Sequence, residues 1–130
     1  MPSPNTGRLY FDLGMKVDNA DIANGDVWKI FVPVPVDCVV KSIYLCEDIK
    51  ASAGTLAVQL ARGAVDTSLL TAATYNLATP TANIGTALVL ATAPHLNLKA
   101  GDSLRAVWTF TTIGTGDGFG CIVEVEPTVW

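Results

Sequence analysis

The sequence has little charge, a single histidine and no long apolar run. Only 15% of its 130 residues are charged, against about 25% in an average soluble domain, while 50% are hydrophobic. A disordered chain needs the opposite balance, with low hydrophobicity and high charge. The composition therefore predicts one folded domain, residues 1–130, with a sizeable core. A surface so poor in charge also indicates that part of it meets other protein.

Clusters of basic residues are missing as well. The eight lysines and arginines are scattered along a chain whose formal net charge is −4. Nucleic-acid binding needs grouped basic side chains to displace counterions from the phosphates, so we expect no nucleic-acid partner. No apolar run approaches the roughly 18 residues of a membrane span. The first residues, MPSPNTGRLYFDLG, lack the basic and apolar regions of a signal peptide, so we expect neither a membrane partner nor secretion.

Cysteine is scarce and odd in number, at positions 38, 46 and 121. An odd count without a secretion signal is typical of reduced thiols in a cytoplasm. If Cys38 and Cys46 share one strand, they lie roughly 26 Å apart at ~3.3 Å per residue and cannot bond to each other. A bridge from Cys121 to either one stays open, but free buried thiols are the expectation.

Metal and nucleophile motifs are also scarce. Sandwich enzymes of the cupin type hold their metal with several histidines, and this chain has only His95. Neither the order nor the spacing of the cysteines supports a pair with that histidine. Asp18, Asp21 and Asp26 offer oxygen ligands but not in the order of an EF-hand. A solvated loop is favoured there, a weak Ca²⁺ site stays open, and no cofactor is expected.

Two further patterns resemble active-site motifs without their context. The glycines of GTGDGFG precede another apolar-alternating run, CIVEVE, whereas a phosphate-binding loop precedes a helix. We therefore expect a hairpin tip there. Glu124 and Glu126 would lie about 7 Å apart on one strand, but glycosidase carboxylates normally come from different strands. The sequence thus predicts a protein that is not an enzyme.

What the sequence does have is alternation of apolar and polar residues with a period of two. The residues expected to share apolar faces are Trp28, Ile30, Val32 and Val34; Val39, Ile43 and Leu45; Leu56, Val58 and Leu60; Leu104, Ala106, Trp108 and Phe110; and Cys121, Val123 and Val125. One apolar and one mixed face is typical of half-buried antiparallel strands. With the shorter candidates RLYFDL, TALVLA and HLNL there are about eight strands, which predict an all-β sandwich or barrel.

Prolines and glycines divide these runs. Pro33 and Pro35 cannot donate to a strand ladder, so they mark a strand end or an edge. The stretches ASAG and KAGD are typical of turns. Residues 64–93 are small, polar and rich in threonine, and we expect a loop there with one short strand or helical turn.

The order of these segments resembles a known family. An N-terminal stretch, GDVWKIFVPVPVDCVVKSIYL, AGTLAVQLARG, a Thr/Ala-rich excursion, LNLKAGDSLRAVWTF and CIVEVEP follow one another from about Arg8 to Pro127. This order is similar to that of the jelly-roll decoration, or cement, proteins of tailed-phage capsids and of phage head-fibre domains. The resemblance implies an antiparallel β-sandwich of jelly-roll type. It also implies a homotrimer made in the host cytoplasm, which sits on the capsid exterior, binds major capsid protein and stabilises the virion.

The resemblance further implies which residues reach a partner. An extended arm over residues 1–14 would precede a sandwich over 15–130, with Arg8, Tyr10 and Phe11 as anchors. An ordinary first strand is the alternative. Trp130 is a further interface candidate, because tryptophan is enriched in interface hot spots. Packing back on its own domain and a free end stay open for it.

A second function remains open. The chain could be a receptor- or glycan-binding module of a phage fibre or tail, in which loop aromatics stack on sugar rings. Tyr75 and Phe119 are the loop aromatics that the sequence offers for this role. Trp28 and Trp108 fall on apolar faces instead, so we expect both in the core.

Overall fold

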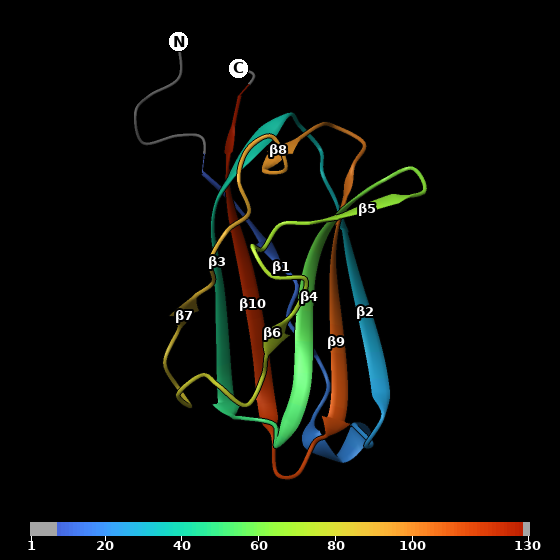
Figure 1. Cartoon of the computed structure of the whole chain (residues 1–130), viewed down its shortest axis with the longest axis vertical. Coiled ribbons are helices and arrows are strands. Elements are labelled where there is room, and N and C mark those ends of the chain that lie inside the picture. The colour runs from blue at the N-terminus through green and yellow to red at the C-terminus, as the bar shows by residue number, and fades with distance from the viewer. Residues whose placement is uncertain (1–7, 129–130) are drawn as a thin grey trace.

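The computed structural model describes residues 8–128 and consists of two antiparallel sheets packed face to face (Figure 1). Sheet A contains, in spatial order, β1 (Leu9–Asp12), β10 (Asp117–Pro127), β3 (Cys38–Ile49) and β7 (Thr86–Ala87), with β8 (Asn97–Leu98) also paired to β3. Sheet B contains β2 (Asp26–Pro33), β9 (Ser103–Thr112), β4 (Ala53–Arg62) and β5 (Val65–Ser68), with β6 (Tyr75–Asn76) also paired to β4. The expected all-β antiparallel sandwich is confirmed. Among these residues a short 3-10 turn at Asn19–Asp21 is the one helical element, and no helix could cross a membrane.

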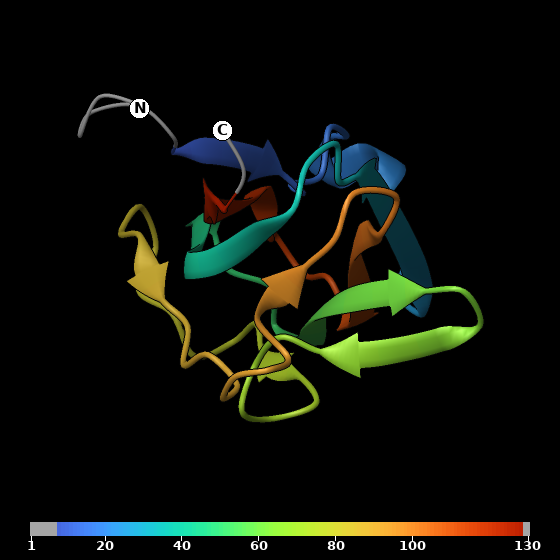
Figure 2. The same ribbon diagram turned by 90° about the horizontal axis from the view of Figure 1, so that it is seen from above.

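Several successive long strands lie in opposite sheets. The chain passes from β2 in sheet B to β3 in sheet A and back to β4 in sheet B, and again from β9 to β10 (Figure 2). The turns at 50–52 and 113–116 therefore carry the chain from one sheet to the other at the end of the core. They do not join neighbouring strands of one sheet. The expected hairpin tip in GTGDGFG is wrong for this reason, since β9 and β10 belong to different sheets. Crossing turns of this kind close the ends of the apolar layer between the sheets.

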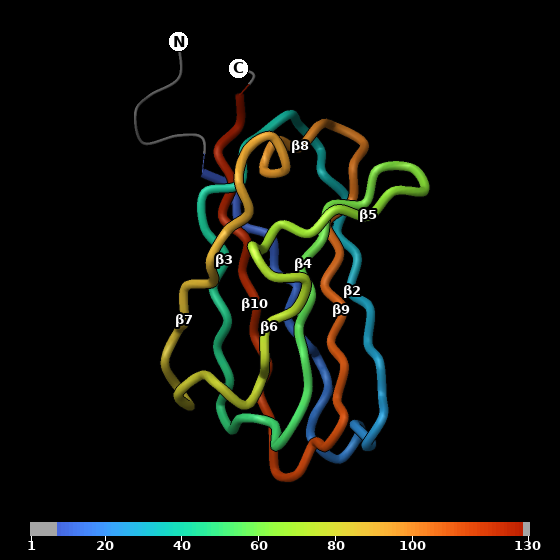
Figure 3. The backbone as a smooth tube through the Cα atoms, viewed as in Figure 1, coloured from blue at the N-terminus to red at the C-terminus, as the bar shows by residue number. Residues whose placement is uncertain are grey.

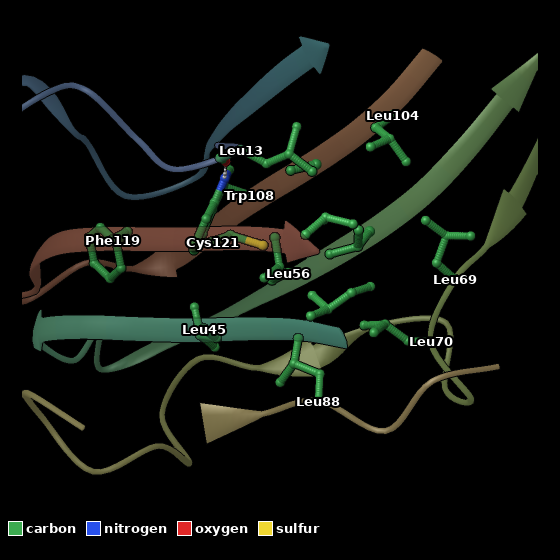
Figure 4. Packing of buried hydrophobic residues seen from close by; sticks show 14 of the residues in the cluster. Leu13, Leu45, Leu56, Leu69, Leu70, Leu88, Leu104, Trp108, Phe119 and Cys121 are labelled. Atoms are coloured by element: carbon green, nitrogen blue, oxygen red, sulfur yellow. Dashed lines mark hydrogen bonds between the residues drawn. The ribbon is translucent and has the colours of Figure 1, made fainter. Parts of the chain in front are cut away.

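The core lies between the sheets and follows the alternation of the sequence (Figure 4). The apolar faces expected for β4, β9 and β10 are confirmed, because their inward residues are all buried. Phe110 and Phe119 lie 4.9 Å apart between ring centroids, in contact with Trp108. The Trp108 indole N–H donates to the backbone oxygen of Leu13 at 3.0 Å, so its polar atom is satisfied inside the core. Trp28, on the edge strand β2, is only half-buried.

Strand β3 departs from the expected pattern. Val40 is 2% exposed and faces the core, whereas Val39 is only half-buried. The register explains the difference: Ser42 pairs with Glu124 and Val40 with Val125, which leaves Lys41 as an extra residue. A bulge of this kind reverses the alternation on one side of it. The assignment of Val39 to the face of Ile43 and Leu45 is therefore wrong.

The excursion between β4 and β9 is more ordered than expected. Its tube runs along the side of the sandwich in Figure 3 and carries β5, β6 and β7 within residues 64–93. One short strand or helical turn is expected there, whereas β5 and β6 are strands that the sequence did not predict, and they raise the total from about eight to ten. Buried leucines hold this segment against the core; they are Leu69, Leu70, Leu77 and Leu88. Burial of about 2 kcal/mol per leucine explains why so polar a stretch stays ordered.

Candidate interaction surfaces

Part of the expected arm is an ordinary edge strand. Residues 9–12 form β1, which pairs with β10 from Leu9 opposite Val125 to Asp12 opposite Ile122. Phe11 packs against the core, while Tyr10 on the opposite face is 62% exposed. For these residues the alternative, a first strand, is correct. Residues 1–7 of the expected arm and Trp130 lie outside the described residues, and the interface role of all four candidates stays a prediction.

Arg8 and Tyr10 belong to a polar cluster on the outer face of sheet A. Glu124 accepts hydrogen bonds from Arg8 Nη1 at 3.1 Å and from the Tyr10 hydroxyl at 3.0 Å. Glu126 lies 3.5 Å from Arg8 Nη2 and 3.7 Å from Lys41 Nζ. The hydrogen bond and the charge of Glu124 raise the pKa of Tyr10. The two carboxylates are thus balanced by cations at an exposed surface, where such ion pairs add little stability.

Beside this cluster an apolar patch crosses sheet A. Ile122 of β10 pairs with Tyr44 of β3, which in turn pairs with Ala87 of β7. Tyr44 is 48% and Ile122 is 38% exposed. We call these three residues the sheet A patch. The patch lies on β10 and β3, which are the most extensively paired strands of the sheet. Their pairing fixes the backbone beneath the patch.

The outer face of sheet B carries a second apolar patch. Val27 and Phe31 on the edge strand β2 are 53% and 57% exposed, and Val107 of β9 lies between them in the paired register. We call these residues the sheet B patch. The guanidinium of Arg105 lies 5.9 Å from the centroid of the Phe31 ring and bonds to Asp66. Lys29, which pairs with Val107, is exposed between Val27 and Phe31 on β2, so this flank offers apolar area around one lysine.

The structure assembles none of the catalytic or metal patterns among the described residues 8–128. No group of three or more His, Cys, Asp or Glu side chains is placed to hold a metal ion in that part of the chain. Asp26, at the start of β2, instead accepts a hydrogen bond from the backbone N–H of Ala23 in the preceding loop at 2.7 Å. His95 lies exposed in the loop before β8.

All three cysteines carry free thiols, as expected. Cys38 and Cys46 both lie on β3, which confirms that they cannot bond to each other. Cys121 is fully buried, and burial raises its pKa to about 12. Burial and the charge of Asp37 also raise the pKa of Cys38. Burial therefore keeps both thiols more firmly protonated than an ordinary cysteine, which makes them less reactive.

The aromatic residues assigned to loops for sugar stacking are not in loops. Phe119 is 2% exposed because β10 already begins at Asp117, so its ring enters the core, and its assignment to a loop is wrong. Tyr75 lies on β6, half-buried, and lines an open groove of about 320 Å³ with Leu70, Leu88 and Val89. The lining of this groove is mostly apolar and lacks the converging polar groups that hold a sugar.

Two buried acids were not singled out from the sequence. Asp102 is 5% exposed and accepts hydrogen bonds from Arg62 Nε at 2.9 Å, from Arg62 Nη2 at 2.7 Å and from the backbone N–H of Lys99 at 2.7 Å. The hydrogen bond from Arg62 is the main cause that lowers the pKa of Asp102. Glu47 is 0% exposed, and neither of its carboxylate oxygens has a hydrogen-bond partner among the described residues.

Burial raises the pKa of Glu47 to about 7, although the backbone of Ala51 and the charge of Lys50 oppose the rise. A signal for this position exists in the sequence. The spacing of Ile43, Leu45 and Glu47 puts all three on one face of a strand, so alternation alone points the carboxyl inward. For the pairing of Asp102 with Arg62 there is no comparable local signal.

Fold and surfaces together define a class, a β-sandwich domain with an apolar patch on each outer face. Beyond that class, no protein-family model matches the chain, and no curated protein or solved structure matches it either. The function must therefore be inferred from the architecture and the sequence pattern.

Proposed function

We propose that this chain is a structural virion protein that decorates the outside of a phage capsid and stabilises it. In this proposal it assembles as a homotrimer, binds subunits of the major capsid protein and performs no catalysis. The observation that carries the proposal is the exposure of the sheet A and sheet B patches on opposite faces of one stiff body. Apolar patches of this kind on a soluble domain mark surfaces that meet other protein.

The strand order supports a jelly-roll assignment for this proposal. Four strands of sheet A run in the order β1-β10-β3-β7 and four of sheet B in the order β2-β9-β4-β5. Two such sheets of four strands, with the chain alternating between them, fit the eight strands of a jelly roll. Under this assignment the short strands β6 and β8 are additions to the eight.

The physical logic of a decoration protein is multivalency. Several modest contacts made by one rigid trimer act together and exceed the affinity of each contact alone. Long paired strands such as β3 and β10 supply the rigidity. Arg8 and Tyr10 lie at the edge of sheet A, beside the end of β10, and in this proposal they contact the capsid or a neighbouring subunit.

The mass of the full chain in solution tests the proposal. We expect a mass close to three times the 13.7 kDa of one chain. The variant F31E places a charge in the sheet B patch and Y44E places one in the sheet A patch, and neither touches the core. The variant whose patch forms the contact between subunits should dissociate the trimer. T115E, an exposed change in the turn after β9, serves as the matched control and should remain trimeric. A wild-type chain that stays monomeric at high concentration would contradict the proposal.

The glycan-binding alternative has less support in the geometry, because Phe119 is buried and Tyr75 is half-buried. A glycan array separates the two functions. A decoration protein should bind no glycan on it, whereas a monomer with glycan affinity would favour the alternative.

A further inference from the structure

Glu47 is a carboxyl group in a position that packing alone would give to an apolar residue. It follows Leu45 on the inward face of β3, pairs with Phe119 of β10 and is 0% exposed. Neither oxygen has a hydrogen-bond partner among the described residues. An unpaired carboxylate is among the costliest groups that a core can hold, whereas the neutral acid costs far less.

Three segments of the chain close against the end of β3 at this point. The backbone N–H of Asn83 donates to the backbone oxygen of Glu47 at 2.7 Å, and that of Leu77 donates to Gly54 at 3.0 Å. A Cβ atom on Gly116 would lie 2.8 Å from the Cα atom of Ala51. The turn at 50–52, the turn at 113–116 and the loop at 77–83 therefore meet here, and we call them the closed corner.

The charged groups around the closed corner do not compensate the negative charge that Glu47 carries when it ionises. Lys50, in the first turn, is exposed, and its positive charge favours the ionised carboxylate only weakly. Asp48 follows Glu47 on β3 and is exposed. Asp117 of β10 accepts a hydrogen bond from the backbone of Asn19 at 3.1 Å, away from Glu47. The loop 77–83 contributes no charged side chain. The backbone N–H of Ala51, in the turn at 50–52, also favours the ionised form, but no donor among the described residues makes a well-formed hydrogen bond to either carboxylate oxygen.

We propose that Glu47 is a pH-sensitive lock, which keeps the corner closed as the neutral acid and loosens it when it ionises. The domain is then most stable in mildly acidic solution and becomes less stable as the pH rises toward and above neutrality. This inference concerns the fold itself and does not rest on the proposed function.

The sign follows from the two states of the chain. The ordinary pKa of the carboxyl is 4.5 and its pKa in the folded domain is about 7. Below the lower value the group is protonated whether the chain is folded or not, and its contribution to stability is fully present. Between the two values only the unfolded chain ionises, so stability falls with rising pH and levels off above about 7.

The test compares pH profiles of unfolding. The equilibrium constant for denaturant unfolding is measured between about pH 4.5 and pH 8.5 for the wild type, E47Q and the control D48N, which removes an exposed neighbouring carboxylate. Relative to E47Q, the wild-type constant should rise on the order of a hundredfold over this range. D48N should run parallel to the wild type. Parallel profiles for the wild type and E47Q would overturn the proposal.

A second measurement needs no variant and decides the question even if E47Q fails to fold. The ¹³C signal of the Glu47 carboxyl is followed during a pH titration of the wild-type protein, together with the exchange rate of the Asn83 N–H. A carboxyl midpoint near 7, with exchange that accelerates through the same range, supports the lock. A midpoint near 4.5, or exchange that does not respond to ionisation, would overturn it.

Discussion

The two buried acids of this sandwich, Asp102 and Glu47, are almost equally hidden from water but differ in every other respect. Asp102 precedes β9 and is held by two hydrogen bonds from the guanidinium of Arg62 and one from the backbone of Lys99. Glu47 lies on β3 with no partner among the described residues. Burial disfavours the charge of both, so the partner decides which acid stays ionised.

The difference gives the two positions opposite pH dependences. The pKa of Asp102 is lowered below its ordinary 3.8, so its contribution to stability is present above that value and is lost as the pH falls through the folded pKa. The pKa of Glu47 is raised, so its contribution is present below 4.5 and is lost as the pH rises through about 7. Together they predict that the domain is most stable in mildly acidic solution.

The largest effect is expected from breaking the paired acid. Asp102→Ala removes the acceptor of three hydrogen bonds and should lower the free energy of unfolding by about 2–4 kcal/mol near pH 6. It should also weaken the loss of stability in acid, because one carboxylate with a lowered pKa is gone. Denaturant unfolding at pH 6 and at pH 3 measures both effects.

Asp66→Ala is the matched control for this change. Asp66 pairs with Arg105, but its side chain is 39% exposed, and exposed pairs contribute at most about 1 kcal/mol. If the two variants lost equal stability, Asp102 would be no more than a surface ion pair.

The same contrast shows what a sequence can predict here. Alternation correctly gave the inward residues of β4, β9 and β10, because each strand encodes its own faces. The same alternation, continued from Leu45, points Glu47 inward, although this position was not singled out from the sequence. The pairing of Asp102 with Arg62 joins residues 40 positions apart, and no local pattern encodes it. The extra residue Lys41 in β3 is equally invisible, because the bulge depends on the register with β10.

The positions of the turns were predicted, but not which sheet the chain enters after each turn. The stretches at 50–52 and 113–116 do turn the chain, yet their residues do not determine whether the next strand joins the same sheet or the opposite one. The start of β10 at Asp117 was missed for a related reason. Glycine-rich sequence is typical of loops, and only the pairing with β3, which runs from Asp117 opposite Ile49 through Phe119 opposite Glu47, draws that segment into the sheet.

Removing the unpaired acid should have a smaller effect, of opposite sign. Glu47→Leu replaces the carboxyl with an apolar group of similar size and should raise the free energy of unfolding by about 1–3 kcal/mol at pH 8. At pH 4.5, where the wild-type group is protonated, the gain should be clearly smaller. Unfolding of the variant and the wild type at the two pH values measures the difference. An equal gain at both would mean that the change improves packing and does not remove a charge.

The smallest effect is expected from Lys50, an exposed cation that favours the ionised form of Glu47. The charge of Lys50 lowers the pKa of Glu47, so Lys50→Met should raise the midpoint of the carboxyl titration. Because Lys50 is exposed, water screens this charge and the increase should be only a few tenths of a pH unit. Lys29→Met, on β2 in the other sheet, should leave the midpoint unchanged. Suppose that removing Lys50 lowered the midpoint or moved it by more than a full unit. Charge and not burial would then control the pKa of Glu47, and Glu47 would differ from Asp102 only in degree.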